Sequence, residues 1–170
     1  MAETKAKDAV ALLKADHRKV EELFAEFEKA RGEGRKQQLA TEICAELSVH
    51  AQIEEEIFYP ACEGKVEEDL LKEAYVEHDG AKVLIAEIIA GEPSDDFYDA
   101  KVKVLQEQIE HHLQEEEKRL EGLFSQARAA GLDMDSLGEE LRARKDQLMA
   151  DIAANGVPSP QLKTMEEASL

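Results

Sequence analysis

Two histidine–glutamate pairs with the spacing His-x-x-x-Glu are the residues best suited to chemistry, His50 with Glu54 and His112 with Glu116. Residues four apart share one face of a helix, so each pair would present an imidazole beside a carboxylate. The second pair interrupts an otherwise apolar stripe formed by Val102, Leu105, Ile109, Leu120 and Leu123. A carboxylate buried there is costly unless a cation compensates it, and no Lys or Arg lies on the stripe. Because imidazole and carboxylate both bind first-row transition metals, the pattern indicates a metal site.

The neighbouring pair, His111 and Glu115, belongs to a more polar stripe. This stripe continues through Gln108 and Lys118, so both residues are expected to face water. Two alternatives stay open at this point. His111 would replace His112 if the helix were turned by about 100 degrees, and a single histidine on an apolar face is also compatible with an ordinary hydrogen-bonded core residue.

The other predicted helices also carry histidines on their apolar faces. Amphipathic segments are predicted at residues 7–30, 36–59, 67–90 and 95–130, the last loosened at Gly122. Short connections between them favour an up-down-up-down four-helix bundle. Each segment has one inward histidine: His17, His50, His78 and His112. Counted from a shared end of the bundle they lie about nine to eleven residues in, which at about 1.5 Å per residue is a single level.

This arrangement predicts one joint metal site. Its candidate ligands are His17, His50, Glu54, His78, His112 and Glu116. Four imidazoles and two carboxylates are too many for one tetrahedral zinc ion and lack the thiolates of structural zinc sites. They suit two ions about 3 to 4 Å apart, bridged by carboxylates, with positions left open for water or a ligand. Ferritin-like bundles place a Glu three residues before the His, where this chain has Leu47 and Ile109.

Composition limits the fold class and the partners. A chain of 170 residues suits one domain with a short appendage. Few aromatic residues and no tryptophan favour an all-α fold. The net charge of -18 would repel nucleic acid and anionic membranes, so neither is an expected partner. Cys44 and Cys62 are too few for a disulfide framework and are interpreted as reduced packing residues.

The remaining segments predict the organisation of the chain. A shorter helix is expected over residues 136–153, where Ser136 and Glu139 have the spacing of a capping box. The predicted division is a bundle at 1–130, a C-terminal helix at 131–154 and a flexible tail at 155–170. No run approaches the roughly 20 apolar residues of a membrane span, and the start lacks the apolar core of a signal peptide. A cytoplasmic monomer or weak dimer is therefore expected.

The sequence around the four histidines resembles the hemerythrin-like family, also called HHE cation-binding domains. The matching segments are DHRKVEELF, HAQIEEEIFYP, EHDGAK and HHLQEEEKRL, within residues 8–125. The resemblance implies a four-helix bundle around a non-haem diiron centre, two iron ions bridged by carboxylates and an oxo or hydroxo group. It assigns the metal to the six candidate ligands named above. Other divalent metals would fit the same ligand types.

The sequence departs from the oxygen-carrying members of that family. Those members have a fifth histidine four residues before the one on the third helix, and a carboxylate five residues after the last histidine. Here these positions are Ala74 and Glu117, and Glu116 is the better placed acid. The departure argues against simple reversible oxygen carriage. It makes the chain more similar to members associated with iron sensing, iron-centre repair, or peroxide and nitric oxide chemistry.

Two tyrosines lie near the predicted site. Tyr75 is one helical turn from His78 and could bind a metal as a phenolate or hydrogen-bond to a ligand. In the alternative interpretation it packs near the seam with its hydroxyl in water. Tyr59, next to Pro60 at a helix end, is the weaker candidate.

Three functions are compatible with this site. The leading hypothesis is a redox-active diiron protein that binds or reacts with O2, NO or peroxide. The alternatives are an oxidoreductase that consumes peroxide or acts as an oxidase, and an iron store, sensor or partner-binding module. Apolar residues one turn from the histidines could line a dry ligand pocket: Val20, Leu47, Ile85 and Ile109. No inward Lys, Arg or Ser offers a further acid, base or nucleophile, so dedicated substrate chemistry has little support.

Overall fold

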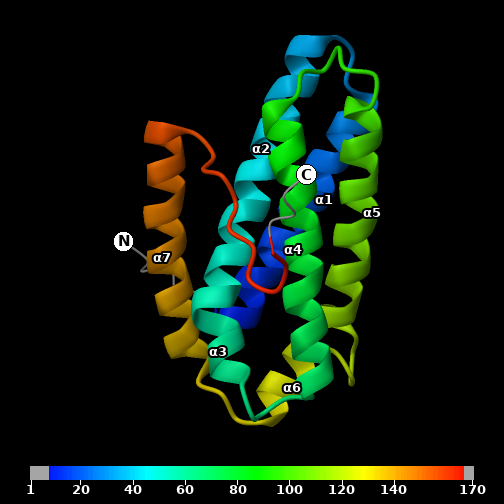
Figure 1. Ribbon diagram of the computed structural model, residues 1–170. Coiled ribbons are helices and arrows are strands. Elements are labelled where there is room, and N and C mark those ends of the chain that lie inside the picture. Colours follow the sequence, from blue (N-terminus) through cyan, green and yellow to red (C-terminus); the bar gives the residue numbers. More distant parts are fainter. Residues whose placement is uncertain (1–7, 167–170) are drawn as a thin grey trace.

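The computed structural model describes residues 8–166, and every regular element in that range is helical. Four long helices form an antiparallel bundle (Figure 1): α1 (Ala9–Lys29), α2 (Glu33–Ile53), α4 (Glu68–Ala90) and α5 (Tyr98–Glu117). The other elements are the π-helical turn η1 (Glu54–Phe58), α3 (Tyr59–Cys62), α6 (Leu123–Ala129) and α7 (Met134–Asn155). The predicted all-α, up-down-up-down four-helix bundle is therefore confirmed.

The first helix shows how the sequence specifies these elements. Asp8 caps α1 because its side chain accepts a hydrogen bond of 2.9 Å from the backbone N–H of Ala11. The chain leaves the helix at Ala30 and turns at Gly32, whose φ of 83° favours glycine. Residues three or four apart along α1 form one buried face: Val10, Leu13, His17, Val20, Phe24 and Phe27.

The end of α2 differs from the continuous helix predicted over residues 36–59. A π-helical turn follows α2, and in it the backbone N–H of Tyr59 donates to the carbonyl of Glu54, five residues back. Pro60 accounts for this wider turn. It has no N–H to offer the carbonyl of Glu56, and its ring crowds that carbonyl in a regular α-helix.

The π-turn changes which side chains face the core. A regular helix would turn Ile57 inward, but Ile57 is only partly buried, whereas Phe58 and Tyr59 are fully buried. The extra residue in the turn rotates the following side chains about the helix axis, and such turns recur at functional sites. Tyr59 thereby enters the bundle interior one turn below Glu54.

The helix predicted over residues 95–130 is two helices joined by a turn. The chain leaves α5 at Lys118, and Gly122 is needed next, because a Cβ there would lie 2.5 Å from the carbonyl oxygen of Lys118. The hydroxyl of Ser125 donates to the carbonyl of Arg119 at 2.7 Å and holds the turn closed. The turn lays α6 across the end of the bundle (Figure 1). It also leaves Leu120 83% exposed, so the inward position predicted for Leu120 is wrong.

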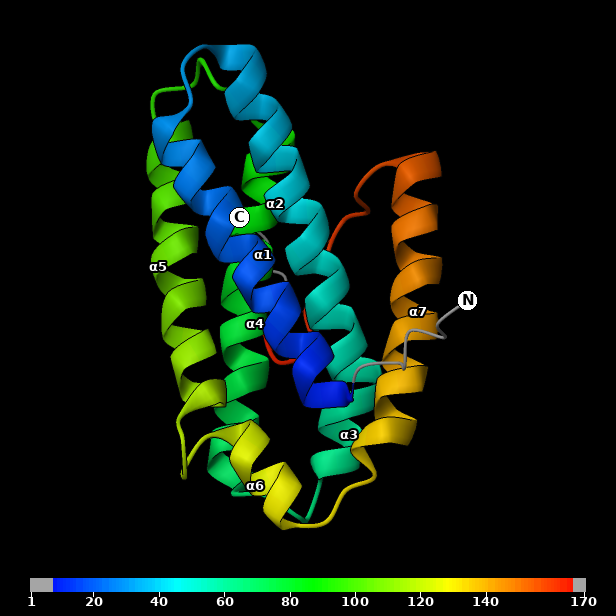
Figure 2. The same ribbon diagram turned by 180° about the vertical axis from the view of Figure 1, so that it is seen from behind.

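The C-terminal helix α7 packs against α1 and α2 (Figure 2). It begins two residues before the predicted start, because Asp133 caps it by accepting from the backbone N–H of Ser136 at 3.0 Å. Ser136 is therefore inside the first turn, and the predicted capping box does not form. Gly156, with a φ of 80°, ends the helix.

The segment 157–166, called the strap below, returns from α7 across α2 to α4 (Figure 1). The sequence predicts a flexible tail from residue 155. The described part instead binds Asp79, which accepts hydrogen bonds from the backbone N–H groups of Lys163, Thr164 and Met165. Residues 1–7 and 167–170 of the predicted segments lie outside the described residues. The three-part division of the chain stays a prediction.

The core consists of two apolar clusters. One lies towards the α1–α2 and α4–α5 loops and includes Phe24, Ile43, Ile85 and Leu105. The other lies at the opposite end and includes Leu13, Phe58, Leu71 and Phe124. The four inward histidines lie between these clusters along their helices. Within the described residues, no helix is both long and apolar enough to cross a membrane.

Candidate metal centre

The structure brings all six predicted metal-binding residues together in the bundle interior. Each is at most 5% exposed: His17, His50, Glu54, His78, His112 and Glu116. Their side chains form two groups in which the potential ligand atoms all lie within 4.8 Å of one another. One group is His17, His50, Glu54 and Glu116, and the other is Glu54, His78 and His112.

The four histidines form two close pairs. In the first pair, the Nε2 atoms of His17 and His50 are 3.1 Å apart. In the second pair, the Nε2 atoms of His78 and His112 are also 3.1 Å apart. Each pair joins two helices, α1 with α2 and α4 with α5, and each thus offers two nitrogen ligands to one point.

Both glutamates lie between the pairs and contact each of them. Glu54 places Oε1 3.2 Å from His50 Nε2 and Oε2 3.2 Å from His78 Nε2. Glu116 places Oε2 3.2 Å from His17 Nε2 and Oε1 3.4 Å from His112 Nε2. One oxygen of each carboxylate therefore faces each pair, which is the arrangement of two bridging carboxylates.

A second set of carboxylates fixes the orientation of the imidazoles. The Nδ1 atoms of the histidines contact, in the order His17, His50, His78 and His112, the carboxylates of Glu117 (2.6 Å), Asp16 (3.4 Å), Glu55 (3.0 Å) and Glu77 (3.2 Å). An ionised carboxylate only accepts, so each Nδ1 carries the proton and donates it. Every Nε2 is then directed into the site, and in the neutral ring it is the nitrogen left to bind a metal.

Sequence analysis did not identify these four outer carboxylates. All four follow or precede a predicted ligand directly in the sequence: Asp16, Glu55, Glu77 and Glu117. They lie off the inward stripe of their own helix, which is why helical periodicity assigns them to the solvent face. The available signal was that each of these acids is adjacent to one of the predicted ligands, from where it reaches a histidine of a neighbouring helix.

The electrostatics of the buried cluster favour positive charge. Burial alone would lower the pKa of His112, but the neighbouring Glu116 carboxylate outweighs it and raises that pKa to about 10. Burial and the Glu116 charge would raise the pKa of Glu54, yet His50 and His78 together hold it at about 2. The two buried carboxylates thus stay ionised because imidazoles compensate their negative charge. A metal ion in the same place would compensate that charge equally.

Two oxygen atoms of the site have no hydrogen-bond partner among the described residues. These are Oε1 of Glu54 and Oε2 of Glu116, both completely buried. Both face the first histidine pair. Buried carboxylate oxygens normally have partners, because an unsatisfied one loses its hydration without compensation. Their positions therefore fit a cation bound between His17 and His50.

Tyr59 occupies the equivalent place at the second pair. Its hydroxyl donates to Glu116 Oε1 (2.7 Å) and lies 3.0 Å from Glu54 Oε2. The same oxygen is 3.2 Å from His78 Nε2 and 3.4 Å from His112 Nε2. Burial and the two carboxylates raise the pKa of this phenol well above its usual value. Tyr59, the weaker candidate from the sequence, is the tyrosine that contacts the predicted ligands.

The other two uncertain residues lie outside the ligand groups. Tyr75 packs the edge of its ring against Tyr59, with ring centroids 5.1 Å apart, and makes no hydrogen bond to the six residues within the described structure. Its position does not support the suggested extra ligand. The side chain of His111 is 67% exposed, whereas His112 is buried, as predicted from their positions on the helix.

A helical bundle with a buried layer of histidines and bridging glutamates defines a class of metal-binding four-helix proteins. Residues 8–124 match the model of the Hemerythrin HHE cation binding domain, and the chain belongs to this family. It is a metal-binding hemerythrin-like protein.

Two further comparisons place the chain among known proteins. It is similar in fold to a hemerythrin HHE cation-binding domain-containing protein from Mycobacterium kansasii, at a TM-score of 0.73 and 22% identity, covering 88% of this chain and 94% of that one. It is also 30% identical over 109 residues to a DNA nickase of Nostoc sp. (strain PCC 7120). The match covers 64% of this chain but only 31% of the nickase.

Proposed function

We propose that the six buried residues bind two iron ions and that the resulting centre binds or reacts with O2, NO or peroxide. The main supporting observation is that two buried carboxylate oxygens without a hydrogen-bond partner lie close to histidine Nε2 atoms that face the site. Two nitrogens and two bridging oxygens face each ion position, which suits octahedral metals with positions left for a ligand. Zinc or manganese would fit the same donors, so the ligand set alone does not select iron.

The protein residues have separate tasks at such a centre. The outer carboxylates orient the imidazoles through their Nδ1–H groups, and the two glutamates would hold the ions together. The iron ions supply the binding and one-electron chemistry towards a small oxidising ligand. Tyr59 places a phenol at the second pair, where it can donate a hydrogen bond or ligate directly. The predicted dry-pocket residues Val20, Leu47, Ile85 and Ile109 are all buried, which limits water on that side.

Reconstitution with ferrous iron under nitrogen tests this proposal. Elemental analysis should find about two ions per chain, and the optical spectrum should change on exposure to air, peroxide or NO. Chelation should lower the melting temperature, because ions that bind only the folded protein stabilise it. One ion or none per chain would contradict a dinuclear centre, and a spectrum indifferent to all three ligands would contradict the proposed reactivity.

The peroxide-consuming alternative is separated by steady-state turnover. Continuous loss of peroxide with many turnovers per chain would favour an oxidoreductase, and a single stoichiometric reaction would favour a binding protein. A partner captured in only one metal state would favour a sensor. The nicking activity of the Nostoc relative is not carried over, because the match covers 31% of that protein and a net charge of -18 repels DNA.

A further inference from the structure

Three of the four outer carboxylates are paired with a permanent cation. Arg18 lies 2.8 Å from Glu117, and Lys82 lies 2.8 Å from Glu55. Asp16 accepts from Lys145 Nζ. Each forms a chain of three groups, a cation, a carboxylate and an imidazole whose Nε2 faces the site. The fourth carboxylate, Glu77, contacts His111 instead, at 3.4 Å.

Two of these chains depend on residues beyond the segment that matches the family model, which ends at residue 124. Lys145 belongs to α7, and its chain leads through Asp16 to His50 of the first pair. Lys82 belongs to α4, but its ammonium group also donates to the carbonyl of Gln161 in the strap at 2.9 Å. Its chain leads through Glu55 to His78 of the second pair. The C-terminal segment thus reaches one histidine of each pair.

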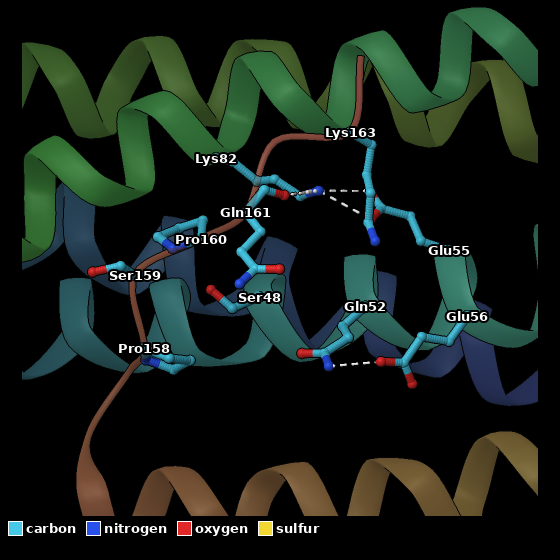
Figure 3. Close-up of a pocket in the computed structure, with 10 residues that line it drawn as sticks. All are labelled: Ser48, Gln52, Glu55, Glu56, Lys82, Pro158, Ser159, Pro160, Gln161 and Lys163. Carbon is cyan, nitrogen blue, oxygen red and sulfur yellow. Dashed lines mark hydrogen bonds and ion pairs between the residues drawn. The ribbon is translucent and has the colours of Figure 1, made fainter. Parts of the chain in front are cut away.

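The strap is held firmly where it meets Lys82. Figure 3 shows Lys82 projecting from α4 towards Gln161 and Glu55, with the strap passing over α2. A cavity of about 300 Å³ lies between α2, Lys82 and the strap. Beyond it, Asp79 accepts three backbone N–H groups and the hydroxyl of Thr164 at 2.7 Å. Lys82 is only 7% exposed, so its charge acts in a poorly solvated environment.

The helix α7 is fixed with similar precision over the first pair. Leu141 is completely buried, and Leu148 is 9% exposed. Arg144 binds the carboxylate of Glu56 through two nitrogens, at 2.7 and 3.2 Å. These contacts place Lys145 over Asp16, which is itself only 6% exposed. A charge held this closely to a buried carboxylate differs from an ordinary surface ion pair.

We infer that the C-terminal segment 134–166 is a functional part of the metal centre, with Lys145 as the positioning residue for His50 and Lys82 as the positioning residue for His78. The inference rests on the proposed two-metal function. A cation fixes the position of the carboxylate and reduces its negative charge, and the carboxylate in turn sets the orientation and basicity of the imidazole. Without Lys145, Asp16 would no longer hold the His50 ring in a fixed orientation, and the ion at the first pair should therefore dissociate faster. The charge of Asp16 would also no longer be compensated, and this should lower the reduction potential of that ion.

The test compares four full-length proteins: wild type, Lys145→Met, Lys145→Arg and Arg142→Met. Arg142 is the matched control, since it is exposed on the same helix and has no ion pair within the described residues. In Lys145→Met, one of the two ions should be released to a chelator up to about tenfold faster, the lower end of what outer-ligand changes cost. Its reduction potential should also fall. Lys145→Arg should restore both values, and Arg142→Met should match wild type.

Each outcome has a definite meaning. Wild type with fewer than two ions would overturn the proposed function and this inference together. Two ions in wild type with unchanged release and potential in Lys145→Met would overturn the inference alone. Equal changes in Arg142→Met would show a general charge effect and also overturn it. Lys82→Gln extends the test to the second pair, where release of the other ion should accelerate.

Discussion

The two histidine pairs have the same donors, but the aromatic residue beside each pair differs. Phe124 of α6 stacks on His17 of the first pair, with ring centroids 5.7 Å apart and planes at 18°. Tyr59 stacks on His78 of the second pair at 5.3 Å and 27°. Only the tyrosine has a hydroxyl, and that hydroxyl donates to Glu116 Oε1 and lies within hydrogen-bond distance of Glu54 Oε2. The carboxylate oxygens facing the first pair have no hydrogen-bond partner among the described residues.

The difference means that two ions bound by this symmetric set of ligands would not be equivalent. An ion at the first pair would have two free carboxylate oxygens and, among the described residues, no competing hydroxyl. An ion at the second pair must either accept Tyr59 as a ligand or displace its hydrogen bonds. We therefore expect the two positions to differ in affinity and in spectrum, with Tyr59 as the main cause.

Removing a shared carboxylate should have the largest effect, because it acts on both positions. In Glu54→Ala each of the two proposed ions would lose an oxygen ligand, because Glu54 contacts both His50 and His78. We expect the iron content to fall to about one ion per chain or less, since a lost ligand leaves the remaining donors too few for a stable pair. Elemental analysis after gel filtration measures the number of iron ions per chain. Glu115→Gln, at an acid outside the site, is the control, and full iron content in Glu54→Ala would disprove the bridging role.

Changing one histidine should affect only its own pair. His112→Ala removes one of two nitrogens at the second pair, so we expect about half of the iron to be lost, with the first pair still occupied. His111→Ala should retain all of it, and should change the free energy of unfolding by no more than about 0.5 kcal/mol, as exposed substitutions do. Iron analysis and denaturant titration of both variants provide the data. Normal iron content in His112→Ala together with loss of iron in His111→Ala would mean that the metal binds on the face of α5 that carries His111.

Removing the hydroxyl of Tyr59 should change how the ion at the second pair is bound, but it should not prevent that ion from binding. Tyr59→Phe keeps the ring that stacks on His78 but frees Glu54 Oε2 and Glu116 Oε1. We expect about two ions to remain, with a changed visible spectrum because the two positions become more alike. Tyr75→Phe is the matched control and should leave the spectrum unaltered. Identical spectra in Tyr59→Phe and wild type would show that the hydroxyl has no part in the centre.

The residues of the site also differ in how readily the sequence predicts them. All six candidate ligands lie on regular apolar stripes, so helical periodicity was sufficient to find them. Tyr59 depends on the π-turn before Pro60, which changes the register by one residue and cannot be anticipated from a period of 3.6. The outer carboxylates and the strap depend on contacts between distant segments, such as Asp79 with Thr164. Helical periodicity alone does not predict such contacts.

The cysteines give the smallest effect and probe the two ends of the bundle separately. Cys44 lies in the apolar cluster towards the α1–α2 and α4–α5 loops, and Cys62 lies in the opposite cluster, with Phe58 and Phe124. Burial raises the pKa of both thiols to about 12, and at Cys62 the charges of Glu54 and Glu116 contribute to that increase. A thiol with a raised pKa is neutral at pH 8, and only the thiolate reacts. Both should therefore resist a thiol reagent at pH 8 in the folded, metal-loaded protein.

Chelation should accelerate labelling of Cys62 several-fold while Cys44 stays protected, because loss of metal loosens the carboxylates next to Cys62 and leaves the cluster around Cys44 intact. Mass spectrometry of the labelled peptides distinguishes the two sites. Equal acceleration at both cysteines would mean that metal loss loosens the whole bundle and not only the part around Cys62.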